Sequence, residues 1–530
     1  MRTQSEQMRR IGVLRNLAPS GPTSYAIEFP IVTKSHTHAG RVEKRRLTQR
    51  IGDMDTLTID VAVIGSGTAG LNARREVERR GGRPVMIESG PYGTTCARVG
   101  CMPSKLLVAA GTAAHDLEHA RHFGVDPGTT RIDGRAVLRR VQRERDRFVS
   151  AVVEETERIP EQQRIRGHAR FTGPTTLVVD ERVRVQANAI VVATGSQPLV
   201  PAPFDRIREH VLTSDDIFDL SDLPESLAVI GTGIIALELG QAMRRLGVRV
   251  AFFNPFDEVG PFSDPDVSRV ACRELAGELD LNVGIKMLTA RVEKGGIELT
   301  WEDPNGVPHQ ESFAKVLVAA GRRPNVADLD LEKTGLLLDK AGVPAVDPQT
   351  VQCADLPIFF AGDVNSHLPL LHEAADEGRI AAANAMAWPN VERHDRRVPL
   401  TIAFTDPQMA IVGSRFADLP QGRYAVGAVS YENQGRARVA ARNRGLVRLY
   451  GELDTCRLLG AEMFGPGMEH MGHLLAWAVQ QRMTAQGALS MPFYHQVLEE
   501  GLRTALRHLA SELGALGNCR PEDLAEAPGV

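Results

Sequence analysis

Two cysteines at short spacing are the residues of this chain best suited to chemistry. Cys96 and Cys101 precede a stretch with the pattern of a helix. Five positions along a regular helix amount to about 7.5 Å of rise, more than the ~7 Å between Cα atoms that a disulfide can bridge. A bond between them would therefore distort the helix start, and Gly100 and Pro103 make that distortion easier. Because a strained disulfide is reduced more readily, the pair is predicted to exchange with other thiols.

The surroundings of the pair support this interpretation. A thiolate released there would lie near a helix N-terminus and near Lys105, and both stabilise negative charge. The alternatives are two buried free thiols or two ligands of a metal ion. A zinc site would need further ligands at short spacing, and no second short-spaced pair occurs among the remaining cysteines, which are Cys272, Cys353, Cys456 and Cys519. We therefore predict no metal site.

A glycine-rich turn follows the first convincing strand. The apolar run 61–64 leads into Gly65, Gly67 and Gly70, spaced as G-x-G-x-x-G, and a helical stretch follows. The first glycine permits a tight turn, the second lets backbone approach a pyrophosphate, and the third lets helix and strand pack closely. The next strand ends in Glu88, whose carboxylate can accept hydrogen bonds from a ribose. These features predict a Rossmann unit.

A second copy of this pattern lies further along the chain. The apolar run 227–230 leads into Gly231, Gly233 and Ala236, and the strand after the next helix ends at Asn254. In both copies 23 positions separate the first glycine from the residue at the strand end. Two Rossmann units in one chain predict two bound dinucleotides.

The second copy differs from the first where the ribose would bind. Asn254 replaces the acid, and residues 255–258 contain no Arg but add Asp257 and Glu258. A 2′-phosphate normally needs an Arg nearby. NAD is therefore favoured over NADP.

The composition agrees with a large globular protein that acts on small molecules or proteins. The chain has 530 residues, which predicts three or four domains, and 43% of them are hydrophobic. Lys and Arg number 62 against 66 Asp and Glu, so the net charge of −4 gives no field for gripping nucleic acid or an anionic membrane. No apolar run reaches the ~18 residues of a membrane helix, and six cysteines are too few for a secreted disulfide scaffold. We expect a cytoplasmic protein.

Residues 1–53 differ from the rest of the chain. They contain ten Lys and Arg against four Asp and Glu, a balance of +6, so the remainder carries −10. We expect this segment to be a disordered extension. Met54, just before the first strand, is a candidate start of translation.

The cysteine segment, both glycine turns and later stretches resemble the class I pyridine nucleotide-disulfide oxidoreductases, and among them most of all the dihydrolipoyl dehydrogenases. The resemblance covers about residues 57–512. It implies an α/β fold with two Rossmann-like dinucleotide-binding domains and a C-terminal α+β dimerisation domain, assembled as a homodimer. The expected parts are an extension (1–53), the first part of an FAD-binding domain (54–200), an NAD-binding domain (201–325), the second part of the FAD-binding domain (326–394), a dimerisation domain (395–515) and a tail (516–530).

The resemblance gives the cysteines and two charged residues distinct roles. It implies that Cys101 is the sulfur next to the flavin, and that Cys96 meets the substrate thiol. Lys105 and Glu238 match an ion pair of the family, the lysine near the flavin ring and the glutamate near the nicotinamide.

A histidine and a carboxylate near the C-terminus match the catalytic base of the family and its orienting partner. They are His495 and Glu500. A His hydrogen-bonded to a carboxylate has the pKa and tautomer control that acid-base work at neutral pH requires. The resemblance implies that this pair acts on the cysteines of the other subunit. Gln496 stands where the family usually has Pro, so the sequence does not determine whether the imidazole of His495 reaches the substrate.

FAD and NAD are the cofactors that the resemblance implies. Its implied FAD contacts are Gly65, Gly67, Gly70, Glu88, Ala169 in a hairpin beside the adenine, Thr194 and Gly195 at the first crossover between domains, Gly321 at the second, and Asp363 on the ribityl chain. Its implied NAD contacts are Gly231, Gly233, Ala236 and Asn254.

The implied reaction is oxidation of a dihydrolipoyl group on a carrier protein, with electrons passing through the disulfide and FAD to NAD. Ser104 favours this member over glutathione reductase, which usually has Lys there, and mercuric reductase is disfavoured because its C-terminal cysteine pair is missing. An NAD(P)H-dependent reductase of another disulfide or a quinone is the alternative that Gln496 keeps open. A flavin-binding scaffold that docks to a dehydrogenase complex is an alternative of another class, against which the intact cysteine pair argues.

Overall fold

The structure is a computed structural model, and it describes residues 55–517. The expected extension at 1–53 and nearly all of the expected tail at 516–530 lie outside the described residues. In the described part of the chain, no helix is long and apolar enough to cross a membrane.

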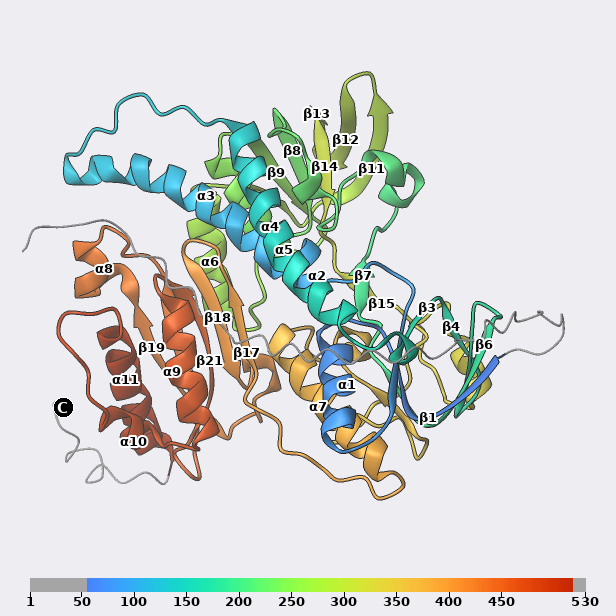
Figure 1. Ribbon diagram of the computed structural model, residues 1–530. Helices are drawn as coiled ribbons and strands as arrows, with labels where there is room; N and C mark the ends of the chain where they lie inside the picture. Colours follow the sequence, from blue (N-terminus) through green and yellow to red (C-terminus); the bar gives the residue numbers. More distant parts are fainter. Residues whose placement is uncertain (1–54, 518–530) are drawn as a thin grey trace, which may run out of the picture. The chain divides into compact units, whose positions relative to one another are not determined.

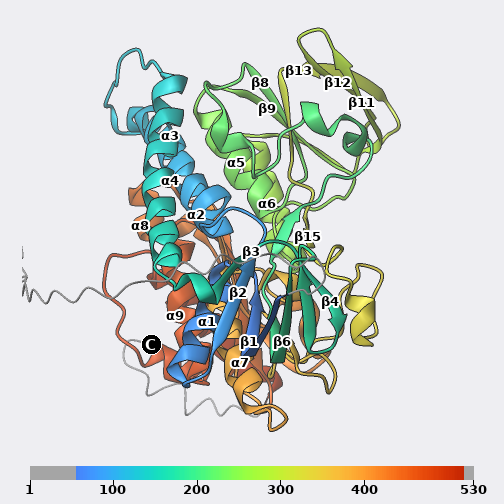
Figure 2. The ribbon, with the colours of Figure 1, turned by 45° about the vertical axis from the view of Figure 1, so that its right-hand side comes forward.

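Seven strands form the first sheet, in the order β3-β2-β1-β6-β5-β4 with β16 beside β6. Figure 2 labels β1, β2, β3, β4 and β6 of this sheet. They are β1 (Asp55–Ile64), β2 (Pro84–Glu88), β3 (Arg164–Arg166), β4 (Ala169–Gly173), β5 (Thr176–Val179), β6 (Val183–Val192) and β16 (Ile358–Phe360). β1 pairs in parallel with both β2 and β6. The apolar run at its end is fully buried, as expected of a parallel strand that is covered on both faces.

Two helices cover one face of this sheet. They are α1 (Thr68–Arg79) and α7 (Leu371–Ala387), which lie side by side (Figure 1). Val61 and Val63 of β1 belong to the buried cluster with these helices. Ala62 and Ile64, which alternate with them along the strand, belong to the cluster on the opposite face. The strand before the first glycine turn is thereby fixed from both sides.

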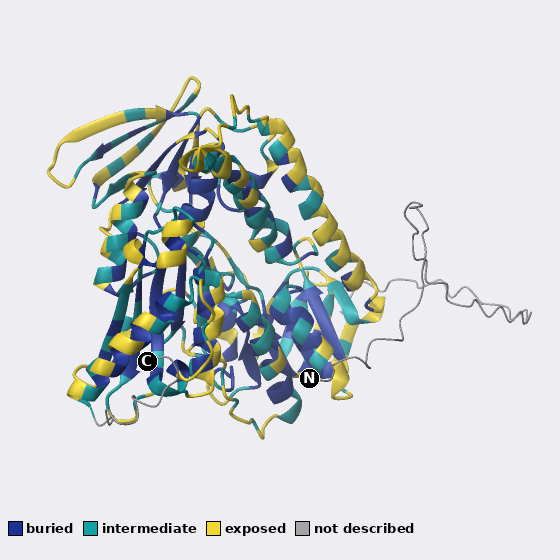
Figure 3. Ribbon diagram, turned by 90° about the vertical axis from the view of Figure 1, so that its left-hand side faces the viewer, coloured by how far each residue is buried: buried dark blue, intermediate teal, exposed yellow. Residues whose placement is uncertain are grey.

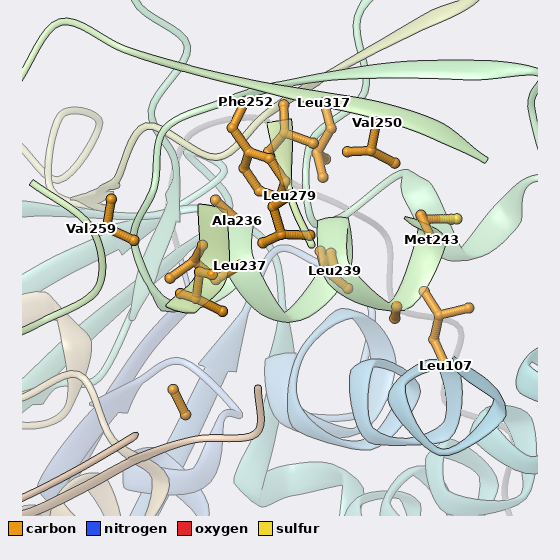
Figure 4. Close-up of a cluster of buried hydrophobic side chains, with 14 of the residues drawn as sticks. Leu107, Ala236, Leu237, Leu239, Met243, Val250, Phe252, Val259, Leu279 and Leu317 are labelled. Carbon is orange, nitrogen blue, oxygen red and sulfur yellow. The ribbon is translucent and has the colours of Figure 1, made fainter. Parts of the chain in front are cut away.

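Four parallel strands form the second sheet, in the order β10-β9-β8-β14. They are β8 (Ser226–Ile230), β9 (Arg249–Asn254), β10 (Asp280–Val283) and β14 (Lys315–Val318), with α5 (Ile234–Arg245) after β8 and α6 (Pro265–Ala276) after β9. An antiparallel sheet of β11 (Lys286–Glu293), β12 (Gly296–Glu302) and β13 (Pro308–Phe313) is inserted before β14. Figure 4 shows Leu237 and Leu239 of α5 in one buried cluster with Phe252 of β9.

Three α-helices lie between β2 and β3 in the chain. They are α2 (Thr95–Val99), α3 (Cys101–His119) and α4 (Gly134–Glu157). α3 packs closely on α5: a Cβ at Gly111 would lie 3.0 Å from Ala242 Cα, and Leu107 points toward α5 (Figure 4). The strands of the first, second and C-terminal sheets are mostly buried, whereas β11 and β13 are largely exposed, as are the outer faces of the helices (Figure 3).

Five antiparallel strands form the C-terminal sheet, in the order β17-β18-β21-β20-β19. They are β17 (Leu400–Ala403), β18 (Gln408–Gly413), β19 (Tyr424–Ser430), β20 (Leu446–Glu452) and β21 (Leu458–Gly465). Two longer helices, α9 (Met468–Gln480) and α11 (Glu500–Leu516), pack on β18 and β19 respectively (Figure 1).

Candidate functional site

The two cysteines lie on either side of a break in a helix. α2 ends at Val99, Gly100 has φ −123° and ψ −120°, and α3 begins at Cys101. A Cβ at Gly100 would lie 3.0 Å from Thr95 O and 3.1 Å from Cys96 Cα. Glycine is therefore the residue that lets the chain fold back closely enough to place the two sulfurs together. The distortion of the helix start expected from the spacing is present.

Both thiols are free in this structure, and they are hydrogen-bonded to each other. The pKa of Cys101 is lowered to about 6, first by this hydrogen bond and also by the positive charge of Lys105, against the opposing effect of burial. The pKa of Cys96 is raised by the same hydrogen bond and by burial. The reduced pair at neutral pH therefore holds a thiolate on Cys101 and a thiol on Cys96.

Lys105 and Glu238 form an ion pair next to this thiolate. Lys105 Nζ lies 2.7 Å from Glu238 Oε2, and the side chain of Glu238 is only 4% exposed. The other carboxylate oxygen accepts a hydrogen bond from the Phe404 amide at 2.9 Å. The structure thus brings together four of the predicted residues, Cys96, Cys101, Lys105 and Glu238, from α2, α3 and α5.

The first glycine turn has the shape of a phosphate cradle. A Cβ at Gly65, whose φ is +109°, would lie 2.3 Å from Ala193 O, and one at Gly70 would lie 2.0 Å from Gly65 O. A Cβ at Gly67 would meet no atom within 4 Å. No side chain caps the helix that follows Gly67, so its first amides are available to an anion. The protein surface here fits a pyrophosphate.

Glu88 lies where the strand after this turn ends. Its Oε2 accepts hydrogen bonds from Ser66 N at 2.7 Å and Ser66 Oγ at 2.8 Å, and its Oε1 accepts one from Gly90 N at 2.7 Å. These contacts orient the carboxylate beside the glycine turn. Ser66 was not singled out from the sequence, although its position between the first two glycines was a signal for it.

The second glycine turn repeats the first, with one difference. Gly231 has φ +108°, a Cβ at Gly233 would meet nothing within 4 Å, and Ala236 is fully buried. Asn254 is also buried, and its amide nitrogen donates to Thr232 Oγ1 at 2.6 Å and to Glu258 O at 3.1 Å. The amide group therefore ties the following loop to the glycine turn.

The two predicted crossovers meet in a short antiparallel pair, β7 (Ser196–Pro198) and β15 (Arg322–Pro324). Thr194 Oγ1 donates to Asn325 O at 2.8 Å, and Asn325 N donates to Gly195 O at 3.0 Å. Gly321 O accepts from Leu199 N at 2.9 Å. The predicted residues Thr194, Gly195 and Gly321 are thus parts of one junction.

Asp363 is linked to the same junction. Its Oδ2 accepts a hydrogen bond from Ser196 Oγ at 2.8 Å, and Arg322 Nε donates to that hydroxyl at 2.8 Å. Ser196 and Arg322 were quoted within the crossover motifs without a role of their own. Ala169 is the first residue of β4 and is buried.

His495 and Glu500, the residues predicted to act as an acid-base pair, are hydrogen-bonded to each other. His495 Nδ1 lies 3.0 Å from Glu500 Oε1, the first residue of α11, and this hydrogen bond lowers the pKa of Glu500. The His495 side chain is 82% exposed. The peptide between His495 and Gln496 is cis, and Gln496 does not separate the histidine from its carboxylate. Within residues 55–517, no hydrogen bond or ion pair joins this pair to the cysteines of the same chain.

No group of three or more His, Cys, Asp or Glu side chains among the described residues is arranged to hold a metal ion. The groups that the structure does assemble are a dithiol, an ion pair, two anion cradles and an exposed His–Glu pair.

Comparison with known families and proteins agrees with these groups of the site. Residues 59–378 match the family described as pyridine nucleotide-disulphide oxidoreductase, and residues 399–506 match its dimerisation domain. The dihydrolipoyl dehydrogenase of Haloferax volcanii is 30% identical, over 86% of this chain and 97% of its own length. A mercuric reductase of Staphylococcus aureus is 29% identical, over 89% of this chain and 85% of its own length.

Solved structures show the same fold. The Cu(II) complex of the HOCl-induced flavoprotein disulfide reductase RclA from Escherichia coli has a TM-score of 0.72 and 22% identity, over 85% of this chain and 99% of that one. The predicted fold class is confirmed, as are the cofactors FAD and NAD(H), which members of the family use. The protein is a flavoprotein disulfide oxidoreductase, and its chain belongs to the pyridine nucleotide-disulphide oxidoreductase family.

Proposed function

We propose that the protein oxidises dihydrolipoyl groups on a carrier protein and reduces NAD. The observation that carries this proposal is the hydrogen-bonded pair of Cys96 and Cys101, in which the pKa of Cys101 is lowered to about 6. Such a pair leaves one sulfur ready as a stable thiolate and the other ready to exchange with a substrate thiol. Among the relatives, named dihydrolipoyl dehydrogenases are 29–31% identical and match 84–86% of this chain and 97% of their own length.

The exchange begins from the oxidised pair. A substrate thiolate attacks the sulfur of Cys96, the bond between Cys96 and Cys101 breaks, and Cys101 leaves as a thiolate beside Lys105. The second substrate thiolate then attacks the substrate sulfur of this mixed disulfide, which forms the cyclic lipoyl disulfide and releases Cys96 as a thiol. The substrate loses two electrons and two protons, and the cysteine pair gains the electrons. We assign to His495 the acceptance of the first substrate proton, and the second substrate proton ends on the released Cys96 thiol.

Bound FAD would carry the two electrons from the cysteine pair to NAD. The residues proposed to hold it are Gly65, Gly67 and Gly70 at the pyrophosphate, Glu88 at the ribose, and Asp363 at the ribityl chain, with Ala169, Thr194, Gly195 and Gly321 around it. For NAD we propose the turn of Gly231, Gly233 and Ala236. Asn254 is proposed to hold the loop that bears Asp257 and Glu258, whose negative charges disfavour a 2′-phosphate.

We propose a homodimer in which the site is shared between subunits. His495 is 82% exposed, and an imidazole so placed can serve a substrate held by another chain. The division into FAD-binding (54–200 and 326–394), NAD-binding (201–325) and dimerisation (395–515) domains is part of this proposal. We also propose that the protein acts in the cytoplasm, where thiols are kept reduced.

The second candidate is an NAD(P)H-dependent reductase of another disulfide or a quinone. The observation that favours it is the mercuric reductase among the relatives, at nearly the same identity as the dihydrolipoyl dehydrogenases. A scaffold without turnover is disfavoured, because the lowered pKa of Cys101 and the formed His495–Glu500 pair serve chemistry.

Turnover with matched substrates tests the proposal. Purified holoenzyme is assayed with dihydrolipoamide and NAD, and separately with several disulfides and quinones together with NADH or NADPH. We expect the highest kcat/KM for dihydrolipoamide with NAD. A reductase reaction that exceeds it by tenfold or more would instead establish the second candidate.

A further inference from the structure

Helix α5 carries three buried polar side chains on one side. Glu238, Gln241 and Arg245 are three and four positions apart, which places them on the same face of the helix. Gln241 is 3% exposed, and the side chains of Glu238 and Arg245 are 4% and 5% exposed. Polar groups buried to this extent are costly unless they are hydrogen-bonded, so their partners show what the face is built to hold.

All three side chains bind one short segment of the dimerisation domain, residues 404–406. Gln241 accepts a hydrogen bond from Asp406 N at 2.8 Å and donates one to Asp406 O at 2.8 Å. Arg245 donates to Asp406 Oδ2 at 3.1 Å and to Asp406 O at 3.3 Å. It also donates twice to Glu278, at 2.6 and 2.9 Å. The backbone of this segment is therefore fixed to α5 at several points.

Phe404, at the start of the segment, connects it to the cysteines. Its amide donates to Glu238 Oε1 at 2.9 Å, and its ring centroid lies 4.8 Å from Lys105 Nζ. A cation over an aromatic ring is attracted to it. Phe404 thus contacts both members of the ion pair beside the thiolate.

The charged and titratable groups that face Cys101 come from three helices. They are the Cys96 thiol from α2, Lys105 from its own helix α3, and Glu238 from α5. Two of these groups are the ones that Phe404 contacts. A displacement of Phe404 would therefore move Lys105 and Glu238 and so change the pKa of Cys101.

We propose that Gln241 and Arg245 are positioning residues for Cys101: they hold segment 404–406 against α5, so that Phe404 keeps Glu238 and Lys105 in place beside the sulfur. The inference rests on the proposed function of the cysteine pair and extends it to the dimerisation domain. Correct attachment of that domain to α5 thereby becomes a condition for a reactive thiolate.

The test is Gln241→Met, which removes the hydrogen bonds to Asp406, and the one that Gln241 donates to Glu278 at 3.0 Å, without a change in formal charge. Reduced holoenzyme is alkylated with iodoacetamide from pH 4.5 to 9.5, and modification of Cys101 is followed by peptide mass spectrometry. We expect the apparent pKa of Cys101 to rise by about one pH unit, which lowers its alkylation rate at pH 6 roughly fivefold. Arg245→Lys, which keeps a cation but not the paired hydrogen bonds, should raise it less.

Gln142→Met is the matched control. Gln142 makes a similar bridge elsewhere, because its amide nitrogen donates to Phe218 O and Leu220 O, each at 3.0 Å. Gln142→Met should lower the thermal stability about as much as Gln241→Met does. Its dependence of Cys101 alkylation on pH should be that of the wild type.

Three outcomes would overturn the inference. The first is that folded, FAD-containing Gln241→Met and Arg245→Lys proteins show the wild-type dependence of Cys101 alkylation on pH. The second is that Gln142→Met raises the apparent pKa of Cys101 as much as Gln241→Met does, which would indicate a general loss of stability as the cause. If Gln241→Met does not fold, a wild-type curve in Arg245→Lys alone is decisive. An ordinary thiol pKa for Cys101 in the wild type would be a different failure, because it removes the proposed function itself.

Discussion

The two glycine turns allow one substitution to be placed at equivalent positions of the two proposed cofactor sites. Gly67 and Gly233 both precede a helix, with φ −74° and −76°, angles that any residue adopts. A Cβ at either position would meet no protein atom within 4 Å. Alanine at these positions should therefore leave the cofactor-free protein intact. It should even stabilise that protein by about 0.4–1 kcal/mol, because alanine restricts the unfolded chain.

The cost of each alanine should appear only when a dinucleotide binds. The added methyl group would occupy the open space over the turn, where the pyrophosphate must approach the helix amides. Losing one hydrogen bond to a charged group costs about 1.5–3 kcal/mol, which weakens binding roughly 10- to 100-fold. Gly67→Ala should weaken FAD by this factor and leave NAD binding nearly unchanged. Gly233→Ala should do the reverse.

The assay reads the two cofactors separately. FAD affinity is measured by reconstitution of flavin-stripped protein followed by flavin fluorescence, and NAD affinity by titration of the FAD-containing protein. Gly70→Ala serves as a contrasting variant: its Cβ would lie 2.0 Å from Gly65 O, so it should destabilise the protein with or without cofactor. The reasoning is refuted if Gly67→Ala binds FAD like the wild type, or if Gly233→Ala loses FAD while keeping NAD.

Four further predictions concern the two cysteines and the pair of His495 and Glu500. Cys101→Ser should retain FAD, read from its absorbance, and lose thiol-disulfide turnover; full dihydrolipoamide activity would contradict the assignment. Because the pKa of Cys101 is lowered to about 6, its alkylation in the reduced enzyme should be nearly constant above pH 7 and fall as the pH drops through 6, whereas a midpoint near 9 would contradict the structure. His495→Gln should slow the dithiol half-reaction roughly 100-fold in stopped-flow measurements while NADH reduction stays intact, and Glu500→Gln should slow it less. Coexpressed Cys96→Ser and His495→Gln subunits should recover part of this activity as heterodimers, which a site contained within one subunit would not allow.

The local features of the fold were accessible from the sequence, because neighbouring residues determine them. The apolar run ending at Ile64 and the glycines after it predict a buried parallel strand, a turn and a helix, and the structure has all three. The spacing of Cys96 and Cys101 likewise predicted a broken helix start, and the break is present at Gly100.

Contacts between distant parts of the chain could not be predicted from the local sequence, and the ion pair of Lys105 and Glu238 was expected only through the family resemblance. Phe404 and Glu238 are 166 positions apart, and nothing in the local sequence of either residue indicates the other. Asn254 illustrates a second limit. The sequence placed it at the strand end where a ribose would bind, but its amide donates to Thr232 and Glu258 within the protein, a choice of partner that depends on the three-dimensional path of the loop.

The paired crossovers have a consequence for how such a chain can be assembled from parts. Pro198 lies directly opposite Arg322 in the antiparallel pair of β7 and β15, so residues 199–321 leave and re-enter the rest of the chain at adjacent points. A segment whose two ends meet in this way behaves as an insertion, since a tight turn could join the same strands in its place. The first sheet, whose strands come from residues before and after the insertion, therefore places no length requirement on it. Residues 199–321, which we propose to bind NAD, can accordingly be exchanged or enlarged as a unit, provided that the faces of α5 toward α3 and toward residues 404–406 are preserved.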